Sequence, residues 1–287
     1  MQPAQYYQTL LSYAYNILGS VQDAQDVVQE VLARHLGHPD PAGIRHEKAY
    51  LIRSVINLAI STKNRQQRTL RAGEVWLPEP VATDDAADRT LNLNEVLSYS
   101  LLVLLERLTA VERAVFILRE SFDYTHEEIA AVLAVTPQHS RQLLSRAKAK
   151  LYKPGPVWSA PEDLHQKTVL EDFIRAISER DVQALEKVMV ADIRFYIDGG
   201  GKIPLAARTC TGAGLVAALL VRIFGQFLST ARLVPAMVNH QPALLSFVAG
   251  SLTSCQIFEV HPGKRAILQM NVVLDPHKMQ SLNHKNL

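Results

Sequence analysis

The stretch from Asp123 to Leu151, DYTHEEIAAVLAVTPQHSRQLLSRAKAKL, constrains the fold of this chain more than any other part of it. It predicts two helices joined by a short turn. Thr125 can cap the first helix, and the glutamates that follow it suit the positive end of the helix dipole. Thr136 can cap the second helix, with Pro137 at the first helical position, where its missing N–H costs nothing.

The second of these helices has one apolar face and one polar face. The apolar face repeats at helical spacing: Leu143, Leu144, Ala147 and Leu151. The polar face carries Gln138, Arg141, Gln142, Ser145 and Arg146. Arginine and glutamine pair bidentately with guanine and adenine edges in the major groove, so this pattern is typical of a helix-turn-helix that reads double-stranded DNA.

An alternative to DNA reading stays open for this motif. An ordinary helical hairpin with a solvated charged face has the same periodicity. In addition, Ala134 stands in the turn, where such motifs often hold glycine. A left-handed conformation would cost this alanine about 1 kcal/mol. The motif by itself therefore does not decide between the two interpretations.

Composition places limits on the class of protein. The chain has 287 residues, enough for two or three domains, and its hydrophobic fraction of 48% indicates packed cores. Its net charge is only +2, so a nucleic-acid surface has to come from local clusters of basic residues. One cluster is Lys63, Arg65, Arg68 and Arg71, and a second is Arg141, Arg146, Lys148, Lys150 and Lys153.

Cysteine usage and the N-terminus exclude further classes. Cys210 and Cys255 have no paired spacing, which argues against a cysteine-rich zinc site, and we expect no metal and no cofactor. The N-terminus lacks the basic start and cleavage site of a signal peptide. No apolar run reaches the roughly 18 residues needed to span a bilayer. We therefore expect a cytoplasmic protein without a membrane partner.

About the first 70 residues predict three helices. The second helix has a polar, mostly acidic outer face, made of Asp23, Asp26, Gln29 and Glu30. A Gly/Pro-rich loop of about residues 38–45 follows it. The third helix, about Lys48 to Lys63, carries Tyr50, Arg53 and Asn57 one turn apart on its exposed face. Aromatic and amide groups in such a row suit unpaired bases.

The remaining chain contains a linker and a region of mixed structure. The linker, about residues 71–92, carries glycine, two prolines and an acidic cluster that argue against a helix. Within it, Val75, Trp76 and Leu77 form an apolar island, which predicts docking on another part of the protein. From about residue 160, helices alternate with strands. In the last strand Gln269 and Asn271 lie opposite an apolar face, where they meet either solvent or a cavity.

Three stretches, which together cover about half of the chain, resemble a known family. LLSYAYNILGSVQDAQDVVQEVLARH looks like the start of a bacterial extracytoplasmic-function sigma factor, with its helix for core RNA polymerase. KAYLIRSVINLAISTKNRQQR resembles the next helix of that family, which reads the minus-ten promoter element. LLERLTAVERAVFILRESFDYTHEE and the helix-turn-helix after it resemble the fourth region, which reads the minus-thirty-five element.

Shorter strings resemble the sigma factors that carry a fused C-terminal SnoaL-like domain. VWLPEP at residues 75–80 is similar to the WLPEP linker signature, and DGGGK at residues 198–202 to a signature inside that domain. DPHKM at residues 275–279 is a weaker match to NPDKL, with Asp, His and Met in place of Asn, Asp and Leu. In such proteins the extension substitutes for a separate anti-sigma protein, with positive and negative effects on activity.

The resemblance implies a multidomain fold and a non-catalytic function. Two all-α sigma domains precede an α+β SnoaL-like cone of the nuclear-transport-factor (NTF2-like) type. The expected ranges are 1–70 for the region 2 domain, 71–93 for the linker, 94–153 for the region 4 domain and 160–287 for the SnoaL-like domain. The implied function is a promoter-specificity subunit whose partners are core RNA polymerase and promoter DNA. Any small-molecule ligand of the last domain stays unknown.

The residues and the resemblance together assign roles to three sets of side chains. The polymerase-binding set is Asp23, Asp26, Gln29 and Glu30. The DNA-binding set is Tyr50, Arg53, Asn57, Lys63, Arg65, Arg68, Gln138, His139, Arg141, Gln142, Arg146 and Lys150. Within it, the lysines and Arg65, Arg68 and Arg146 are expected at phosphates, and His139 in either role. The regulatory interface is Trp76, Leu77, Pro78, Asp198, Gly199, Gly200, Gly201 and Lys202.

Two other functional interpretations stay open. In the first, the helix-turn-helix regulates a fused SnoaL-like isomerase or hydrolase, for which Asp198, His240, His261 and Lys202 are the nearest candidates. The segment has no metal-ligand spacing and no nucleophile motif, however, so we expect no catalytic residue. Its DGGGK string also has the pattern of a strand that ends in a tight turn. In the second, the protein is a ligand-sensing repressor that acts without polymerase.

Overall fold

The computed structural model of the chain describes residues 3–37, 44, 46–69, 75–84, 91–151, 163–200 and 209–285. The chain divides into two compact units. The first contains Met1–Arg71 and Ala86–Gly155, and the second contains Ala72–Asp85 and Pro156–Leu287. The segment expected as a linker therefore belongs to the same unit as the C-terminal domain. The helices before and after it form the other unit.

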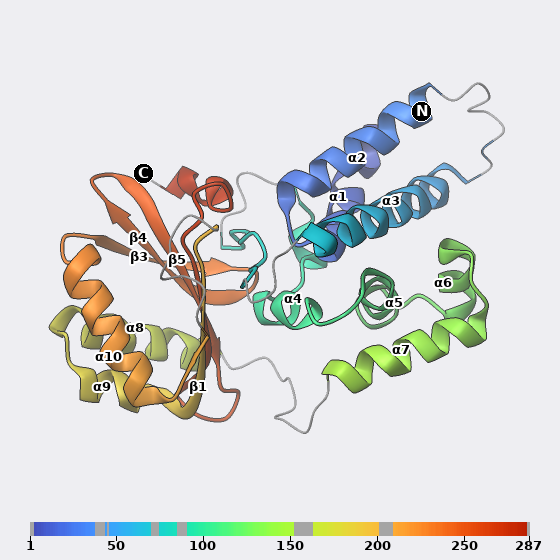
Figure 1. Ribbon diagram of the computed structural model, residues 1–287. Coiled ribbons are helices and arrows are strands. Elements are labelled where there is room, and N and C mark those ends of the chain that lie inside the picture. Colours follow the sequence, from blue (N-terminus) through green and yellow to red (C-terminus); the bar gives the residue numbers. More distant parts are fainter. Residues whose placement is uncertain are drawn as a thin grey trace. The chain divides into compact units, whose positions relative to one another are not determined.

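The first unit begins with four helical elements. They are η1 (Pro3–Tyr6), α1 (Tyr7–Leu18), α2 (Val21–Leu36) and α3 (Glu47–Thr69) (Figure 1). Gly19 ends α1 in the left-handed conformation, with φ of 75°. Ser20 caps α2 by accepting the backbone N–H of Asp23 at 3.2 Å. The helix α3 continues beyond the expected end at Lys63, since no glycine or proline interrupts the sequence before Gly73.

The second helical set completes this unit. Its elements are η3 (Leu93–Glu95), α4 (Tyr99–Leu105), α5 (Ala110–Glu120), α6 (His126–Leu133) and α7 (Pro137–Leu151). Thr109 and Thr125 cap α5 and α6, each in a capping box with the glutamate three residues further on. The helix α4 begins at Tyr99, and the backbone of Val96 before it is extended.

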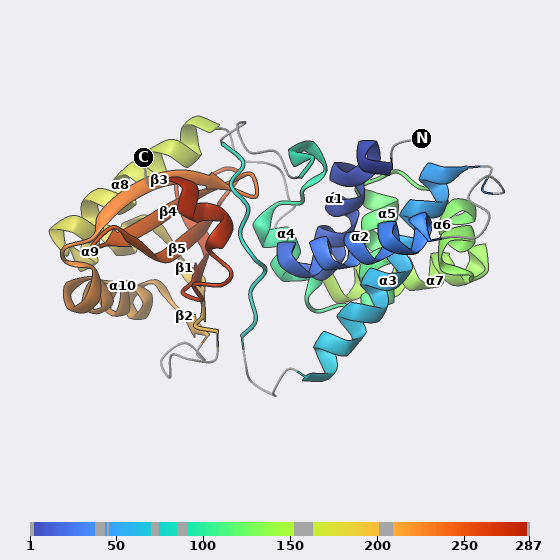
Figure 2. The ribbon, with the colours of Figure 1, turned by 90° about the horizontal axis from the view of Figure 1, so that it is seen from above.

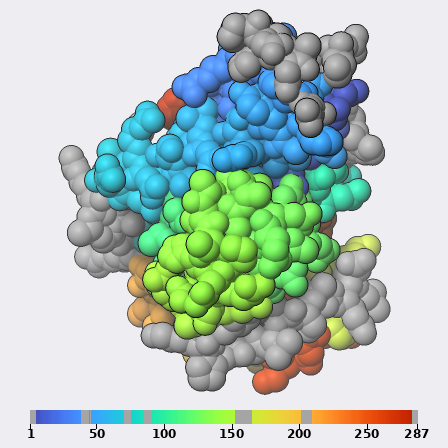
Figure 3. Space-filling view, turned by 90° about the vertical axis from the view of Figure 1, so that its right-hand side faces the viewer, coloured from blue at the N-terminus to red at the C-terminus, as the bar shows by residue number. Residues whose placement is uncertain are grey.

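The two helical sets share one core within this unit. α1, α2 and α3 pack on one another, and α3 also contacts α5 and α6. Figure 3 shows α6 and α7, in green, beside the blue surface of α2 and α3. Leu10, Leu51, Val115 and Leu118 are among the fully buried side chains. Burial of each such side chain contributes about 1.5–3 kcal/mol, so this shared core holds the two sets together.

The second unit is built on a six-stranded sheet with the strand order β2-β1-β6-β5-β4-β3. The strands are β1 (Met189–Asp198), β2 (Cys210–Thr211), β3 (Arg232–Val238), β4 (Gln241–Val248), β5 (Ser251–Val260) and β6 (Ile267–Val273). β1 and β6 pair in parallel, whereas the other neighbours are antiparallel. The helical elements are α8 (Asp163–Glu179), α9 (Val182–Lys187), α10 (Ala213–Ile223), η4 (Phe224–Leu228) and η5 (Gln280–Lys285).

The two faces of the sheet differ in polarity. One face packs on α8, α9 and α10, and the rings of Phe173 and Phe258 meet there at 4.8 Å between centroids. On the opposite face, Gln269 and Asn271 are 4% and 0% exposed. The amide of Gln269 donates to the amide oxygen of Asn271 at 3.0 Å. These two polar side chains are therefore not in contact with solvent.

Residues 75–84 lie along the second unit as an extended segment, which we call the strap; Figure 2 shows it in cyan. The strap forms a β-bridge between Ala82 and Val238. The backbone N–H and carbonyl of Val81 bond to Asn239, at 2.9 and 2.8 Å. Leu77 is only 1% exposed. The prediction that the apolar island docks on the protein is confirmed.

Candidate nucleic-acid interface

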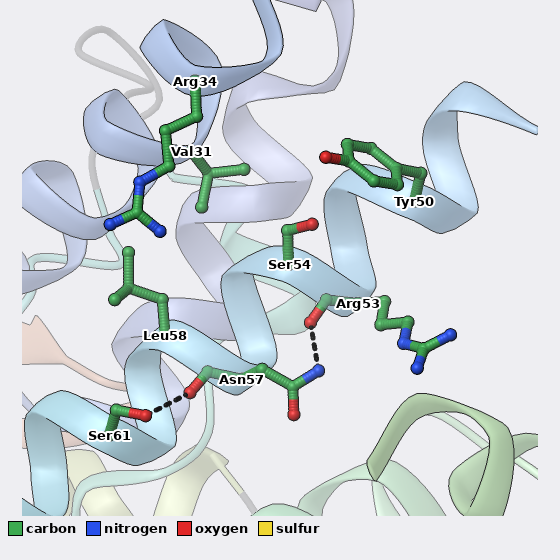
Figure 4. A pocket seen from close by; sticks show the side chains of 8 residues that line it. All are labelled: Val31, Arg34, Tyr50, Arg53, Ser54, Asn57, Leu58 and Ser61. Atoms are coloured by element: carbon green, nitrogen blue, oxygen red, sulfur yellow. Dashed lines mark hydrogen bonds between the residues drawn. The ribbon is translucent and has the colours of Figure 1, made fainter. Parts of the chain in front are cut away.

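A groove of about 460 Å³ lies between α2 and α3 (Figure 4). Its lining residues are Val31, Arg34, Tyr50, Arg53, Ser54, Asn57, Leu58 and Ser61. Three of them, Tyr50, Arg53 and Asn57, are the side chains that the sequence places one turn apart on a single face. The structure brings all three to this groove. The hollow is comparable in size to small-molecule pockets, so an unstacked nucleotide base fits within it.

Tyr50 lies at the edge of the groove with its ring partly exposed. Its side chain is 37% exposed, and its ring centroid lies 5.9 Å from that of His35. His35 is itself buried, and its Nε2 atom lies 2.8 Å from a carboxylate oxygen of Glu47. The buried histidine supports one side of the tyrosine ring. The open side can therefore stack on an unpaired base.

Arg53 and Asn57 point away from α2, toward the second helical set (Figure 4). Arg53 is exposed. The amide nitrogen of Asn57 donates to the backbone carbonyls of Arg53 at 2.9 Å and of Val132 at 3.0 Å. Val132 belongs to α6, so the amide expected to read a base is engaged by the helix-turn-helix in this structure.

The expectation for Lys63 requires a correction. This side chain is only 2% exposed, and its ammonium donates to the backbone carbonyl of Leu18 and to the carboxylate of Glu106. A buried, ion-paired ammonium cannot contact a DNA phosphate, so Lys63 leaves the DNA-binding set. Arg65 and Arg68 are exposed on α3. Arg71 and Lys153 lie outside the described residues, as do residues 38–43 and 45 of the loop before α3.

The helix-turn-helix has the local structure that the sequence predicts. Thr125 caps α6, and Thr136 accepts the backbone N–H of His139 at 3.1 Å at the start of α7. Ala134 adopts the left-handed conformation, with φ of 53° and ψ of 44°. Leu143 is buried, as are Ala147 and Leu151, whereas Leu144 is half-buried. Gln138, His139, Arg141, Gln142, Ser145 and Arg146 are exposed.

Carboxylates hold several basic side chains of α7 in place. Arg141 pairs with Glu127 of α6 at 2.9 Å, and both side chains are more than half exposed. Lys150 pairs with Glu112 at 2.6 Å, and Lys148 with Glu120 at 2.9 Å. The pair of Arg141 with Glu127 is exposed and contributes about 0–1 kcal/mol, so a DNA phosphate or base can displace that carboxylate. Glu112, by contrast, is buried.

A half-buried histidine joins the two helices of the motif. The Nδ1 atom of His126 lies 2.9 Å from the hydroxyl of Ser140, which is fully buried. Burial, with the nearby charges of Arg141 and Arg119, lowers the pKa of His126 below its ordinary value. The imidazole is therefore neutral at pH 7, and the contact does not add positive charge to the surface of α7.

An ion pair of the C-terminal domain binds the strap at Leu77. The carboxylate of Asp198 accepts the backbone N–H of Leu77 at 2.8 Å. Lys278 donates to the carbonyl of Leu77 at 2.7 Å and pairs with Asp198 at 2.6 Å. Its ammonium also lies 4.3 Å from the centroid of the Trp76 ring. Trp76, Leu77 and Asp198 thus come together as the sequence predicts; Lys278, at the NPDKL-like string, was not in the predicted set.

The turn after Asp198 requires glycine at one position. Gly200 has φ of 62°, and its N–H bonds to Asp198 at 2.9 Å. A Cβ atom on Gly200 would lie 2.5 Å from the carboxylate of Asp275. Gly200 of the DGGGK string therefore packs directly on Asp275 of the DPHKM string. Gly199 and Pro78 are buried, and Gly201 and Lys202 lie outside the described residues.

Comparisons with known proteins identify the family. A Sigma-70 region 2 model matches residues 4–69, and a Sigma-70 region 4 model matches residues 98–151. The ECF RNA polymerase sigma factor SigJ of Mycobacterium tuberculosis is 32% identical over 225 residues, which are 77% of this chain and 71% of SigJ. The chain belongs to the ECF RNA polymerase sigma factors.

Two further comparisons extend over nearly the whole sigma factor. The probable ECF RNA polymerase sigma factor SigI of Mycobacterium tuberculosis is 28% identical over 278 residues, covering 95% of this chain and 92% of SigI. The crystal structure of SigJ has a TM-score of 0.76 at 25% identity, and the match covers 98% of this chain and 99% of that chain. The C-terminal domain is therefore part of the shared architecture.

The family membership establishes the general function. This sigma factor directs bacterial RNA polymerase to promoters, so core enzyme and promoter DNA are its partners. Sigma factors initiate transcription without catalysis of their own. Of the side chains weighed for an enzyme, Asp198 is occupied by the strap, His240 lies in the turn between β3 and β4, and His261 follows β5. No described helix is long and apolar enough to cross a bilayer.

The acidic outer face of α2 is formed as expected. Asp26, Gln29 and Glu30 are exposed, whereas Asp23 is half-buried and accepts the amide of Gln66 at 2.7 Å. Glu30 pairs with Arg34, one turn further along α2. Arg34 was not among the predicted functional residues. Only the helix packing shows that it lines the same groove as Tyr50.

Proposed function

We propose that this sigma factor recognises promoters with the α3 groove and the α7 surface, and that its C-terminal domain regulates this activity in cis through the strap. The observation that carries the proposal is the ion pair of Asp198 and Lys278, which binds both backbone polar groups of Leu77. Along the chain, the strap lies between α3 and the second helical set. Holding it on the C-terminal domain ties that domain to the connection between the two promoter-binding parts.

The promoter-binding roles follow from exposure and chemistry. At the groove, Tyr50 stacks on an unpaired base of the minus-ten element, and Arg53 and Asn57 contact its edges or backbone. On α7, three exposed side chains approach base edges in the minus-thirty-five element: Gln138, Arg141 and Gln142. His139 contacts a base or a phosphate, and Arg65, Arg68, Arg146 and Lys150 bind phosphates.

The polymerase-binding role rests on the acidic face of α2. Asp26, Gln29 and Glu30 present exposed carboxylates and an amide, and Asp23 lies at the same edge. Such a face suits a basic surface of the polymerase. The sigma factor accordingly acts in the cytoplasm, where its polymerase partner is found.

The regulatory part of the proposal is tested with point variants in the full-length chain. Lys278→Met and Asp198→Asn each remove one half of the ion pair that holds Leu77. We expect transcription from a cognate promoter to change in the same direction in both single variants. The double variant should show little further change, because the two side chains act as one unit.

A matched pair in the same domain serves as the control. Arg175 and Asp172 of α8 form an ion pair that includes no strap residue. Arg175→Gln and Asp172→Asn should leave transcription unchanged. Affinity for core polymerase is measured in parallel, so that an effect on promoter activity is separated from loss of the holoenzyme. Unaltered transcription in all three strap variants would refute regulation through this contact.

A further inference from the structure

We propose that Arg34 of α2 is an additional DNA-contacting residue, which binds a phosphate of the unpaired promoter strand in the α3 groove. This inference rests on the proposed role of that groove in minus-ten recognition. It concerns a residue on the neighbouring helix, whose acidic outer face is assigned to the polymerase. The helix α2 would therefore contact the polymerase through its acidic face and DNA through Arg34.

The position of Arg34 supports a DNA contact. Its guanidinium lies over the groove on the same side as Tyr50, Ser54 and Leu58 (Figure 4). The side chain is 67% exposed, so it keeps the freedom to reach a strand that enters from solvent. An arginine binds phosphate with its planar fork of donors, and a base stacked on Tyr50 would bring its own phosphates to the edge of the groove.

The charge of the groove supports an anionic ligand. Its eight lining residues include two arginines, Arg34 and Arg53, and no carboxylate. These cations come from different helices and line the groove together with Ser54, Asn57 and Ser61. A groove lined by cations, hydroxyl groups and an amide suits a sugar-phosphate backbone.

Glu30 occupies the guanidinium of Arg34 in the free protein. The two residues are one helical turn apart, and both side chains are about half exposed or more. Such pairs change an equilibrium constant by only about a factor of two, so a phosphate can replace the carboxylate at little cost. When a basic polymerase surface engages Glu30, the same exchange becomes easier. Binding of core enzyme would thus favour the DNA contact of Arg34.

The test measures promoter binding by the holoenzyme as a function of salt. A promoter is first selected from a random library with wild-type holoenzyme. The probe is then a fork-junction DNA that carries the selected minus-ten element as a single strand. If wild-type holoenzyme selects no promoter from the library, the proposed function itself is contradicted. The role of Arg34 is tested only on a promoter that wild-type holoenzyme binds.

Arg34→Gln should lower the salt slope of log affinity by about 0.7, the value for one phosphate contact on single-stranded DNA. The ratio of wild-type to variant affinity should therefore be about fivefold larger at 0.1 M salt than at 1 M salt. Arg34→Lys keeps the positive charge and should retain most of the slope. Arg175→Gln is the control, because that arginine is also 67% exposed in an ion pair within a helix, but on the C-terminal domain.

Two outcomes would overturn the inference. One is an unchanged affinity and salt slope in Arg34→Gln. The other is weaker core binding in Arg34→Gln with normal DNA binding of the holoenzyme that does form, which would place Arg34 at the polymerase. A circular dichroism melt accompanies each variant, so that a loss of α2 stability is recognised.

Discussion

The ammonium of Lys63 on α3 lies 2.8 Å from the carboxylate of Glu106 at the end of α4, in an ion pair that is nearly excluded from solvent. Arg113 of α5 pairs with the same carboxylate and is itself fully buried. The Nε atom of Arg113 donates to the backbone carbonyl of Asn16 at 3.0 Å. One carboxylate thus neutralises two buried cations and connects the two helical sets of the first unit.

Glu106→Gln is expected to destabilise the first unit by about 3 kcal/mol at pH 7, because it leaves two buried cations without their counter-charge. Denaturant unfolding monitored by circular dichroism measures the change. Glu120→Gln removes the carboxylate of the more exposed pair with Lys148 and should cost less than about 1 kcal/mol. Similar losses in the two variants would contradict the central role of Glu106.

The same carboxylate predicts a pH dependence of stability. Burial by itself raises the pKa of Glu106, but Arg113 and Lys63 outweigh it and hold the pKa below its ordinary value. The stabilisation is therefore fully present above about pH 4.3, the pKa of an unfolded glutamate, and is lost as pH falls through the lower folded pKa. The stability difference between wild type and Glu106→Gln should narrow below about pH 4. A constant difference down to pH 2 would disagree with this assignment.

Ala134→Gly should stabilise the first unit by about 1 kcal/mol. Ala134 ends α6 in the left-handed conformation, which glycine adopts without the steric cost of a Cβ atom. Ala131 is the matched control, since it is exposed within the same helix. Ala131→Gly should have the opposite sign and cost about 0.5–1 kcal/mol. Thermal unfolding of both variants gives the comparison.

Two arginines of α7 should affect promoter binding in different ways. Arg141→Ala is expected to weaken binding by about 1–3 kcal/mol and to relax base preference at one position of the minus-thirty-five element. Arg146→Ala should weaken binding to all sequences evenly and lower the salt slope by about 0.9. Binding to a library of minus-thirty-five variants measures both. Retention of full promoter discrimination in Arg141→Ala would remove it from the base-reading set.

Trp76 offers a direct measure of strap binding. Its half-buried ring contacts Lys278, and the chain has one other tryptophan, Trp158. In a Trp158→Phe background, Asp198→Asn should move the Trp76 emission to longer wavelength, because Lys278 loses its counter-charge, its contacts with the strap weaken and the indole meets more water. Asp172→Asn in the same background should leave the emission unchanged. An unshifted emission in Asp198→Asn would mean that the strap stays bound without this carboxylate.

The local features of this protein could be predicted from its sequence. Helix caps at Ser20, Thr125 and Thr136, and the exposed row on α7, follow from propensity and periodicity within a few residues. The docking of Trp76 and Leu77 was also predictable, since an apolar island in a polar linker has to be covered. Lys63 was misplaced because a lysine in a basic run has the same pattern on a solvated helix as on a buried one. Its partner Glu106 is far away in the sequence.

The sequence by itself therefore determined the elements, their caps and the family to which they belong, because each depends on residues within one or two turns of each other. The tertiary structure alone decided which charges are buried and which are free. It placed Lys63 beside Glu106 and Lys278 beside Asp198, and it brought Arg34 to the groove of Tyr50. Those relationships depend on how distant segments pack, and a long charged side chain carries no sequence signal that reveals its partner.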